Sequence, residues 1–340
     1  MKSWYSTEGK DCDVALYTKI TLIRNVKGFP FPNRMNEEQR SQVNELVINA
    51  LNADEEFKNK FEVVEYGKLP NITALALKER GLISDKFTEP PLNKKIILSK
   101  DDSVSIMLCG EDHIRVTVLV GGLDFELAFG VAEELDNLIC SSLPIAFDDR
   151  LGFLTESPTE LGTALRAETL LHLPSIEAEG EIRSIADSVS RIGLSIKGIT
   201  NREGYNNGAF YRLTNLITVG ITERDAIENL SSITCQIIDR ERMARDSIDR
   251  ISIEDTIFRA VALLKSARKI HTEEAEELIS KLKLGVSYGV IGNLPQHMPY
   301  ELLVESGDGM LQSVYGEMNG DDVEITRAEH IRRILSNINI

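Results

Sequence analysis

The sequence predicts an α+β protein in which a strand-rich part is followed by an all-helical part. Between residues 93 and 129, β-like runs are broken by the polar letters KDD and GED, a pattern typical of an antiparallel meander. From about Ser252 onward, apolar residues instead recur with helical spacing. We therefore expect two units, residues 1–250 and residues 251–340.

The first strand and the first long helix are predicted from local patterns. Residues 14–25, VALYTKITLIRN, are rich in β-branched residues and are typical of a strand. The prolines of residues 27–35 then indicate a turn or loop. Asn36, with Gln39 three residues later, is a capping signal for a helix. The apolar stripe of this helix is formed by Val43, Leu46, Val47 and Ala50.

The middle of the chain is expected to hold a helix, a loop and a second helix. Residues 131–140 have helical spacing. Residue 152 opens a short strand, which leads into a loop rich in Ser, Pro, Thr and Gly. We expect a helix to begin near Thr163 and to carry Arg166, and we expect Pro174 to end it.

Two more strands and a long helix complete the first unit. Residues 194–199 and 210–219 are strand-like and flank a Gly/Asn-rich loop. Thr222 with Asp225 resembles a capping box at the start of a long amphipathic helix. After it, helical patterns cover most of the second unit.

Composition narrows the function. The 340 residues include 38 Lys and Arg against 54 Asp and Glu, a net charge of -16, which argues against non-specific binding to nucleic acid or to an anionic membrane. No apolar run approaches the roughly 20 residues that span a bilayer. The cysteines are scattered without a CxxC pair, so neither a disulfide framework nor a zinc site is expected. We expect a cytoplasmic protein.

A cluster of ionisable residues interrupts the predicted strands within residues 108–118, LCGEDHIRVTV. A solvated polar turn would explain the cluster, and His113 alone is typical of a buried, hydrogen-bonded histidine. The edge of a site would also explain it, with a carboxylate as base and an arginine that binds phosphate. The residues leave both interpretations open. The cluster consists of Glu111, Asp112, His113 and Arg115.

Two other segments are candidates with ordinary alternatives. The loop before Arg166 could place an anion at the start of the predicted helix, or it could be a plain loop–helix junction. In residues 14–25, Lys19 and Arg24 alternate with apolar residues, so one of them could face a site. Charges on an edge strand would look the same.

Taken in order, these segments resemble the phosphagen (guanidino) kinases, and most of all the McsB-type protein-arginine kinases. The resemblance covers most of the chain. It is carried by YTKITLIRN (residues 17–25), CGEDHIR (109–115), GFLTESPTELGTALRA (152–167), KGITNREGYNNGAFYRLTNLITVG (197–220) and a tail from Ile253 that contains LKLGVSYGVI.

The resemblance implies a catalytic domain, residues 1–250, with an antiparallel sheet flanked by helices. Residues 251–340 would be a C-terminal helical domain for dimerisation or regulation. The implied reaction transfers the γ-phosphoryl group of ATP, bound with Mg²⁺, to arginine side chains of proteins in quality control or stress response. Implied partners are proteins with exposed arginine, an adaptor, a Clp-type chaperone-protease and a second copy of the chain.

The resemblance also implies roles for individual residues. Glu111 matches the carboxylate that orients the guanidinium and acts as base, while Arg115 and Arg166 match phosphate-binding arginines. Lys19 and Lys197 stand where the family has two more arginines, so they keep the charge but lose the planar fork.

Other positions depart from the family pattern. Thr21 replaces a phosphate-contacting arginine, and Ser157 replaces the reactive cysteine. When the sequence is aligned with the family without a gap, Arg202 stands at the position of the second catalytic carboxylate. The adjacent Glu203 is therefore the candidate for that carboxylate, provided that the loop shifts by one residue. The phosphoarginine-reading motif RDxxRA appears as VEITRA, residues 323–328. These departures keep a second hypothesis open, a catalytically impaired pseudokinase that acts as a regulatory or adaptor protein.

Overall fold

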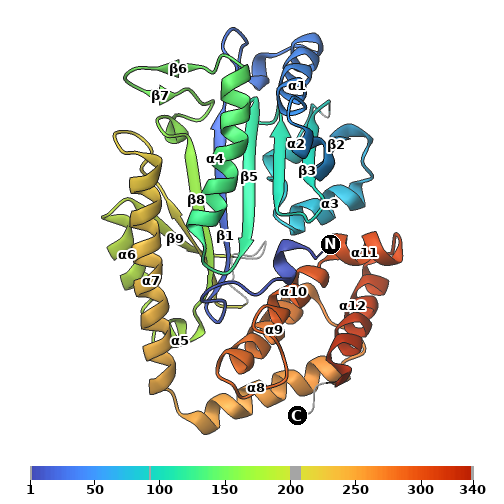
Figure 1. The fold of residues 1–340 in the computed structure, drawn as a ribbon. Coiled ribbons are helices and arrows are strands. Elements are labelled where there is room, and N and C mark those ends of the chain that lie inside the picture. Colours follow the sequence, from blue (N-terminus) through green and yellow to red (C-terminus); the bar gives the residue numbers. More distant parts are fainter. Residues whose placement is uncertain (1, 92, 200–207, 338–340) are drawn as a thin grey trace.

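An eight-stranded sheet runs through the part of the chain that the computed structural model describes, residues 2–91, 93–199 and 208–337. Its strand order is β2-β3-β4-β5-β1-β8-β10-β9, and all neighbouring strands are antiparallel (Figure 1). The strands of this sheet are β1 (Ala15–Arg24), β2 (Phe61–Glu65), β3 (Lys95–Ser99), β4 (Val104–Leu108), β5 (Ile114–Gly121), β8 (Leu165–His172), β9 (Leu194–Gly198) and β10 (Phe210–Asn215).

Helices surround the sheet and then form the end of the chain. A short hairpin, β6 (Phe147–Asp148) and β7 (Gly152–Phe153), precedes β8. The helices among the strands are α1 (Glu37–Leu51), α2 (Glu55–Lys60), α3 (Asn71–Glu79), α4 (Phe125–Ser142), α5 (Pro174–Ala178), α6 (Ile182–Ser190) and α7 (Glu223–Ser247). The later helices are α8 (Arg250–Ser266), α9 (Thr272–Ser287), α10 (Met298–Glu305), α11 (Asp308–Tyr315) and α12 (Gly320–Ile334).

The two faces of the sheet carry different side chains. One face is covered by helices, because α4 packs on β1 and β5, α7 packs on β8 and β10, and α6 packs on β9. In β1, Ile20 and Leu22 are buried in the apolar core on that side. Side chains alternate along a strand, so Lys19 and Thr21 point to the opposite face. The alternation therefore leaves the polar side chains of the central strands together on the face that these helices do not cover.

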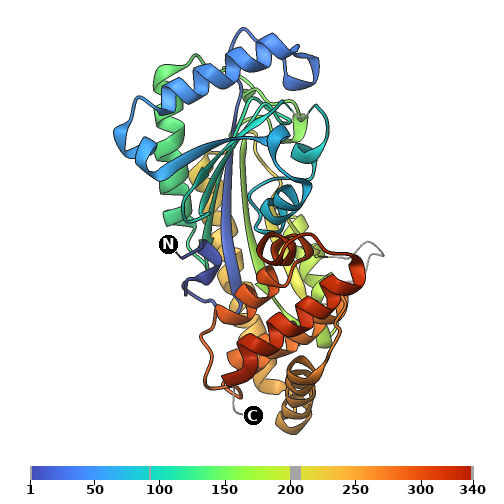
Figure 2. The same cartoon turned by 90° about the vertical axis from the view of Figure 1, so that its right-hand side faces the viewer.

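The C-terminal helices gather at one end of the sheet (Figure 2), and the buried residues between 253 and 335 form an apolar cluster of their own. The N-terminal segment connects them to the sheet. Trp4 packs edge-on against Tyr17 of β1, with 5.6 Å between ring centroids, and lies 6.0 Å from the ring of Tyr300 in α10. These aromatic contacts fix α10 beside the polar face of the sheet.

Two groups of polar contacts, one around Lys283 and one around Asp13, reinforce this connection. Lys283 of α9 is almost fully buried and donates hydrogen bonds to the carbonyl oxygens of Cys12, at 2.5 Å, and Gln296, at 2.9 Å. Burial lowers the pKa of Lys283 to about 8. The carboxylate of Asp13 pairs with Arg242 at 2.5 Å and with Arg245 at 3.1 Å, both in α7. Together these contacts hold the N-terminal segment against α7 and α9.

Most elements expected from the sequence are confirmed, including β1, the three-strand meander and the later helices. Asn36 caps α1 through a capping box with Gln39, and Thr222 caps α7 in the same way with Asp225. The strand expected over residues 210–219 ends earlier, at Asn215.

The helix expected from Thr163 onward is wrong, because residues 165–172 form β8. β8 lies between β1 and β10 and pairs with both, so its backbone groups are bonded on either side. Helix propensity differs among ordinary residues by less than about 1 kcal/mol each, and pairing in the middle of a sheet overrides it. Pro174 does not end a helix but stands at the first position of α5, where proline is favoured.

The pairing of Asp13 predicts a pH-dependent contribution to stability. Burial acts to raise the pKa of Asp13, but hydrogen bonds and charges from Arg242 and Arg245 outweigh it and lower the pKa. We expect Asp13→Asn to reduce the free energy of unfolding by about 1.5–3 kcal/mol at pH 7. Because the native pKa is depressed, this contribution is present above about pH 4 and is lost as the pH falls through the native pKa. Urea unfolding at several pH values measures it.

Asp239→Asn is the matched control. Asp239 lies 3.9 Å from the same Arg242 but is largely exposed, so its removal should cost less than about 1 kcal/mol. Equal losses in the two variants, or a loss in Asp13→Asn that does not shrink at low pH, would contradict the role of the Asp13 pairs.

Candidate functional site

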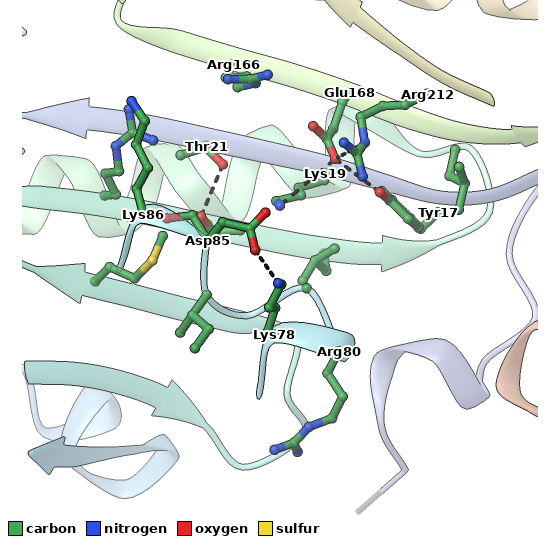
Figure 3. A pocket seen from close by; sticks show the side chains of 18 of the residues that line it. Tyr17, Lys19, Thr21, Lys78, Arg80, Asp85, Lys86, Arg166, Glu168 and Arg212 are labelled. Carbon is green, nitrogen blue, oxygen red and sulfur yellow. Dashed lines mark hydrogen bonds and ion pairs between the residues drawn. The ribbon is translucent and has the colours of Figure 1, made fainter. Parts of the chain in front are cut away.

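A cavity of about 710 Å³ opens on the polar face of the sheet (Figure 3). Strands β1, β4, β5, β8 and β10 contribute its floor, and residues 78–86 form one side. Trp4 of the N-terminal segment and Tyr300 of α10 line its aromatic end. Its size lies within the range of about 300–1,000 Å³ that is usual for ligand sites.

Strand register sets the positions of the charged side chains in this cavity. Thr21 on β1 lies opposite Thr117 on β5 and Arg166 on β8. Lys19 lies opposite Glu168, two residues along. Directly opposed residues of an antiparallel pair point to the same face, so these side chains converge without any further folding of loops.

At one end of the floor, the carboxylate of Glu168 contacts a tyrosine hydroxyl and two cationic side chains (Figure 3). Its Oε1 accepts a hydrogen bond from the Tyr17 hydroxyl at 3.1 Å, and it lies 3.4 Å from Nε of Arg212 and 4.0 Å from Nζ of Lys19. Glu168 is 5% exposed. Burial acts to raise its pKa, but the charges of Lys19 and Arg212 outweigh burial and the pKa is lowered. The carboxylate is therefore ionised at neutral pH.

At the other end, the guanidinium of Arg115 is surrounded by carboxylates. Its Nη1 lies 3.1 Å from Glu111, its Nε lies 3.3 Å from Asp112, and its Nη2 lies 2.5 Å from Oε2 of Glu160. Oε1 of Glu160 also lies 3.7 Å from Nη1 of Arg166. Burial raises the pKa of Glu160, although the nearby Arg115 acts to lower it.

Asp112 and His113 have structural roles in the turn between β4 and β5. Asp112 is 1% exposed and accepts hydrogen bonds from Nδ2 of Asn25 and from the backbone N–H of Glu156, each at 2.8 Å. Nδ1 of His113 accepts the N–H of Val26 at 2.9 Å, which leaves Nε2 to donate to a backbone carbonyl. Burial lowers the pKa of His113. The histidine is thus neutral and buried.

Glu111 stands at the boundary of two cavities. It pairs with Nζ of Lys86 at 2.8 Å as well as with Arg115, and Lys86 is largely exposed. A second cavity of about 440 Å³ shares Glu111, Lys86, Ser157 and Glu160 with the first. A group entering the second cavity can therefore reach Glu111, while the strand cations line the first cavity.

The structure brings together Glu111, Lys19, Arg115 and Arg166, as expected from the sequence. Lys197 lies on the edge strand β9 opposite Arg212 and is exposed, and it does not line the cavity. Glu203, expected as the second carboxylate, lies outside the described residues.

Thr21 and Ser157, which depart from the family pattern, also line the cavity. Thr21 shares a hydrogen bond of 3.1 Å with the hydroxyl of Thr117, so two neutral hydroxyls lie between Lys19 and Arg115. Ser157 shares a hydrogen bond of 2.8 Å with Thr159 within the loop. Neither position supplies a charge.

Sequence reasoning missed several residues of the cavity. Glu168 and Arg212 were not predicted as site residues, because residues 165–172 were expected to form a helix. In a strand, alternation places Arg166 and Glu168 on the same face, and pairing with β10 brings Arg212 beside them. Glu160 lies in the loop before β8, and its pairing with Arg115 exists only in the folded loop. The aromatic end, with Tyr300, depends on packing between distant segments.

The charged side chains of the segment VEITRA, residues 323–328, bind to other parts of the C-terminal helices and loops. Arg327 is 1% exposed, and its guanidinium donates to the carbonyl oxygens of Ser306, at 2.9 Å, and Ile270, at 2.8 Å, and pairs with Asp308. Glu324 pairs with Lys269 at 3.0 Å and with His271. These contacts give Arg327 a structural role in holding α12 against the preceding loops.

In the described parts of the chain, no group of three or more His, Cys, Asp or Glu residues is placed to hold a metal ion. Among the same residues, no helix is long and apolar enough to cross a membrane.

Comparisons with known proteins agree with this geometry. Residues 42–244 match the family described as ATP:guanido phosphotransferase, C-terminal catalytic domain, and residues 250–339 match the protein-arginine kinase McsB C-terminal domain. The protein-arginine kinase of Clostridium acetobutylicum is 32% identical over 98% of this chain and 100% of its own length. That of a Geobacillus species is 34% identical, over 98% of this chain and 94% of its own.

Solved structures show the same fold. Lombricine kinase superposes with a TM-score of 0.62 over 73% of this chain and 71% of its own, at 18% identity. The duplicated taurocyamine kinase from Schistosoma mansoni superposes with a TM-score of 0.63 over 81% of this chain and 41% of its own, at 22% identity. With these matches, the chain belongs to the ATP:guanido phosphotransferase family and carries, after its catalytic part, the McsB-type C-terminal domain.

Proposed function

We propose that the protein is a protein-arginine kinase, which transfers the γ-phosphoryl group of ATP to arginine side chains of proteins in quality control or stress response. One observation carries the proposal: cationic side chains from neighbouring strands converge in a cavity whose edge is formed by the carboxylate Glu111. Relatives 32–34% identical over nearly the whole chain bear the name protein-arginine kinase, which supports it.

The cationic floor fits the phosphates of a nucleotide. Arg115, Arg166 and Arg212 offer planar donors that match phosphate oxygens, and Lys19 adds a point charge. Lys197 does not line the cavity, so it would contact a nucleotide only where the ligand extends past the floor to β9. Phosphoryl transfer depends mostly on positioning and charge stabilisation, and these side chains supply both. We propose that Mg²⁺ arrives with the nucleotide, where it would neutralise phosphate charge.

The acceptor is a guanidinium, whose pKa above 12 makes it a poor nucleophile until a proton leaves. Glu111 would orient it and take that proton as the nitrogen attacks the γ-phosphorus, while the bond from phosphorus to the bridging oxygen breaks and ADP departs. Lys86, whose side chain is 66% exposed, now pairs with Glu111, and its ammonium group can return to water when the pair is broken. An incoming guanidinium can therefore replace the ammonium group of Lys86 at little cost.

We also propose different roles for the two parts of the chain. Residues 1–250 would form the catalytic domain, and residues 251–340 would form a C-terminal helical domain for dimerisation or regulation. Proteins with exposed arginine would be the substrates, with an adaptor and a Clp-type chaperone-protease as partners in the cytoplasm. The match of residues 250–339 to the McsB C-terminal domain supports this assignment.

Light scattering tests the dimer. It should give a mass close to twice the chain mass of 37.9 kDa. A mass equal to that of one chain at micromolar concentration would contradict this part of the proposal.

Replacement of Glu111 tests the catalytic assignment. Glu111→Gln keeps the shape of the side chain but cannot take a proton, so we expect kcat to fall about 10²–10⁴-fold. The measurement is acid-labile phosphate formed on an arginine-rich protein from γ-labelled ATP. Glu62→Gln, an exposed change on β2, serves as the control. The same acceptor with lysine in place of arginine should take up no phosphate.

The outcomes of this experiment separate the hypotheses. Equal rates for Glu111→Gln and the unchanged protein would remove Glu111 from the chemistry. If the unchanged protein binds ATP and transfers nothing to any arginine acceptor, the impaired pseudokinase holds and the kinase proposal fails.

Replacement of Arg166 tests the phosphate assignment. Arg166 is half-exposed, with an ion-pair contact to Glu160 at 3.7 Å, so Arg166→Ala should leave the thermal midpoint nearly unchanged. We expect the KM for ATP to rise about 10–100-fold, because a charge-assisted contact to phosphate is lost. Arg183→Ala, an exposed change on α6, is the control. An unchanged KM for Arg166→Ala would place the phosphates elsewhere.

A further inference from the structure

Glu160 occupies the position that an anion would take between two arginines. Its Oε2 contacts Nη2 of Arg115 at 2.5 Å, and its Oε1 faces Nη1 of Arg166 at 3.7 Å. Carboxylates and phosphates meet guanidinium groups in the same planar geometry, with two oxygens directed at nitrogen donors. The structure thus holds a carboxylate of its own where the proposed function places nucleotide phosphate.

The cations of the floor are already paired. Four cations, contributed by β1, β5, β8 and β10, are in contact with four carboxylates, and Lys86 pairs with one of the same carboxylates. A polyphosphate cannot gain from all four cations while every carboxylate remains in place. The cations are Lys19, Arg115, Arg166 and Arg212, and the carboxylates are Glu111, Asp112, Glu160 and Glu168.

Two of these carboxylates are fixed. Asp112 is fully buried and is bound by Asn25 and by a backbone N–H. Glu168 is in the middle of β8 and is held by the Tyr17 hydroxyl. Glu111 is at the cavity edge and is needed there for the acceptor.

Glu160 differs because, among the described residues, its carboxylate is held only by Arg115 and Arg166. It ends the 3₁₀ turn Pro158–Glu160, and its side chain borders both cavities. Two contacts hold the backbone of the loop that contains this turn in place. The N–H of Thr163 donates a hydrogen bond to the carbonyl oxygen of Thr218 at 2.8 Å. Gly162, at φ +99°, packs against the same residue so closely that a Cβ on Gly162 would lie 2.0 Å from the carbonyl oxygen of Thr218. The glutamate side chain can therefore rotate away while its loop stays in place.

We propose that Glu160 is an internal competitor for the nucleotide phosphates: it bridges Arg115 and Arg166 in the free protein and must leave both arginines before phosphate can bind. The inference rests on the proposed function for the identity of the displacing ligand. It makes Glu160 a positioning residue, which keeps the two guanidinium groups paired and sets how tightly a nucleotide is held.

Glu160→Gln tests this inference in the full-length protein. Glutamine keeps the shape but forms no ion pair, so we expect the Kd for ATP with Mg²⁺, and for inorganic tripolyphosphate, to fall about tenfold in calorimetric titration. Glu181→Gln is the matched control: it removes one carboxylate that pairs with Arg240 away from the cavity, and it should leave both Kd values unchanged. Equal affinities in Glu160→Gln and the unchanged protein would overturn the proposal.

Glu160→Asp separates bridging from net charge. Aspartate keeps the charge but is one methylene shorter, so it cannot reach both arginines, and we expect an intermediate gain in affinity. If Glu160→Asp binds ATP no more tightly than the unchanged protein while Glu160→Gln does, the bridge is not the cause and the proposal fails. Thermal unfolding of each variant shows whether it is folded, and the aspartate variant keeps the test valid if the glutamine variant is not.

Steady-state kinetics provide a readout that a purely structural role would not change. In Glu160→Gln the KM for ATP should fall while kcat does not rise, because only ground-state competition is removed. A fall in kcat with KM unchanged would overturn the inference. Tripolyphosphate binding is independent of transfer, so tighter binding in Glu160→Gln without any arginine phosphorylation would leave the inference standing and remove only the proposed kinase activity.

Discussion

The site depends on the compensation of positive charge on one face of one sheet. Guanidinium and ammonium groups from four strands line one cavity, and like charges that share a site repel more strongly where water is excluded. Glu168 supplies the compensation at one end, buried among Tyr17, Lys19 and Arg212. Asp112 and Glu160 supply it at the other end around Arg115. The free protein can therefore fold with its anion-binding groups already in place.

Strand register converts this charge pattern into a site. β1 is paired on both sides, with β5 and β8, so its side chains have a defined phase. A slip by one residue would turn Lys19 into the apolar core under α4 and expose Ile20 to the cavity. The buried aliphatic side chains of β1 therefore hold the cationic ones in position, although they never touch the cavity.

The local parts of this arrangement could be predicted from the sequence, and the non-local parts could not. β1 and the caps at Asn36 and Thr222 depend on residues a few positions apart, and their patterns predicted them. β8 depends on partners more than 100 positions away in β1, and its Leu, Ala and Glu content favours a helix when it stands alone.

The candidate site divides in the same way. Glu111, Arg115, Arg166 and Lys19 were predicted by resemblance, because each lies in a short stretch that resembles a family motif, with Lys19 in the place of an arginine. Their carboxylate partners Glu160 and Glu168 could not be assigned, since a partner is defined by pairing across strands and loops. Lys197 is exposed on β9 outside the cavity and Glu203 lies outside the described residues, so the roles of both stay predictions.

The N-terminal segment has a consequence for how the chain is made. Asp13 reaches Arg242 across 229 positions of sequence, and Ser287 donates to the Asp13 carbonyl from 274 positions away. Trp4, on the same segment, packs against Tyr300. Chains fold as they emerge from the ribosome, N-terminal end first, and contacts of such long range slow folding. Part of this segment therefore completes its packing only after α9 has been synthesised, and a chain truncated before α9 would lack the contacts of Lys283 and Ser287 with residues 12 and 13.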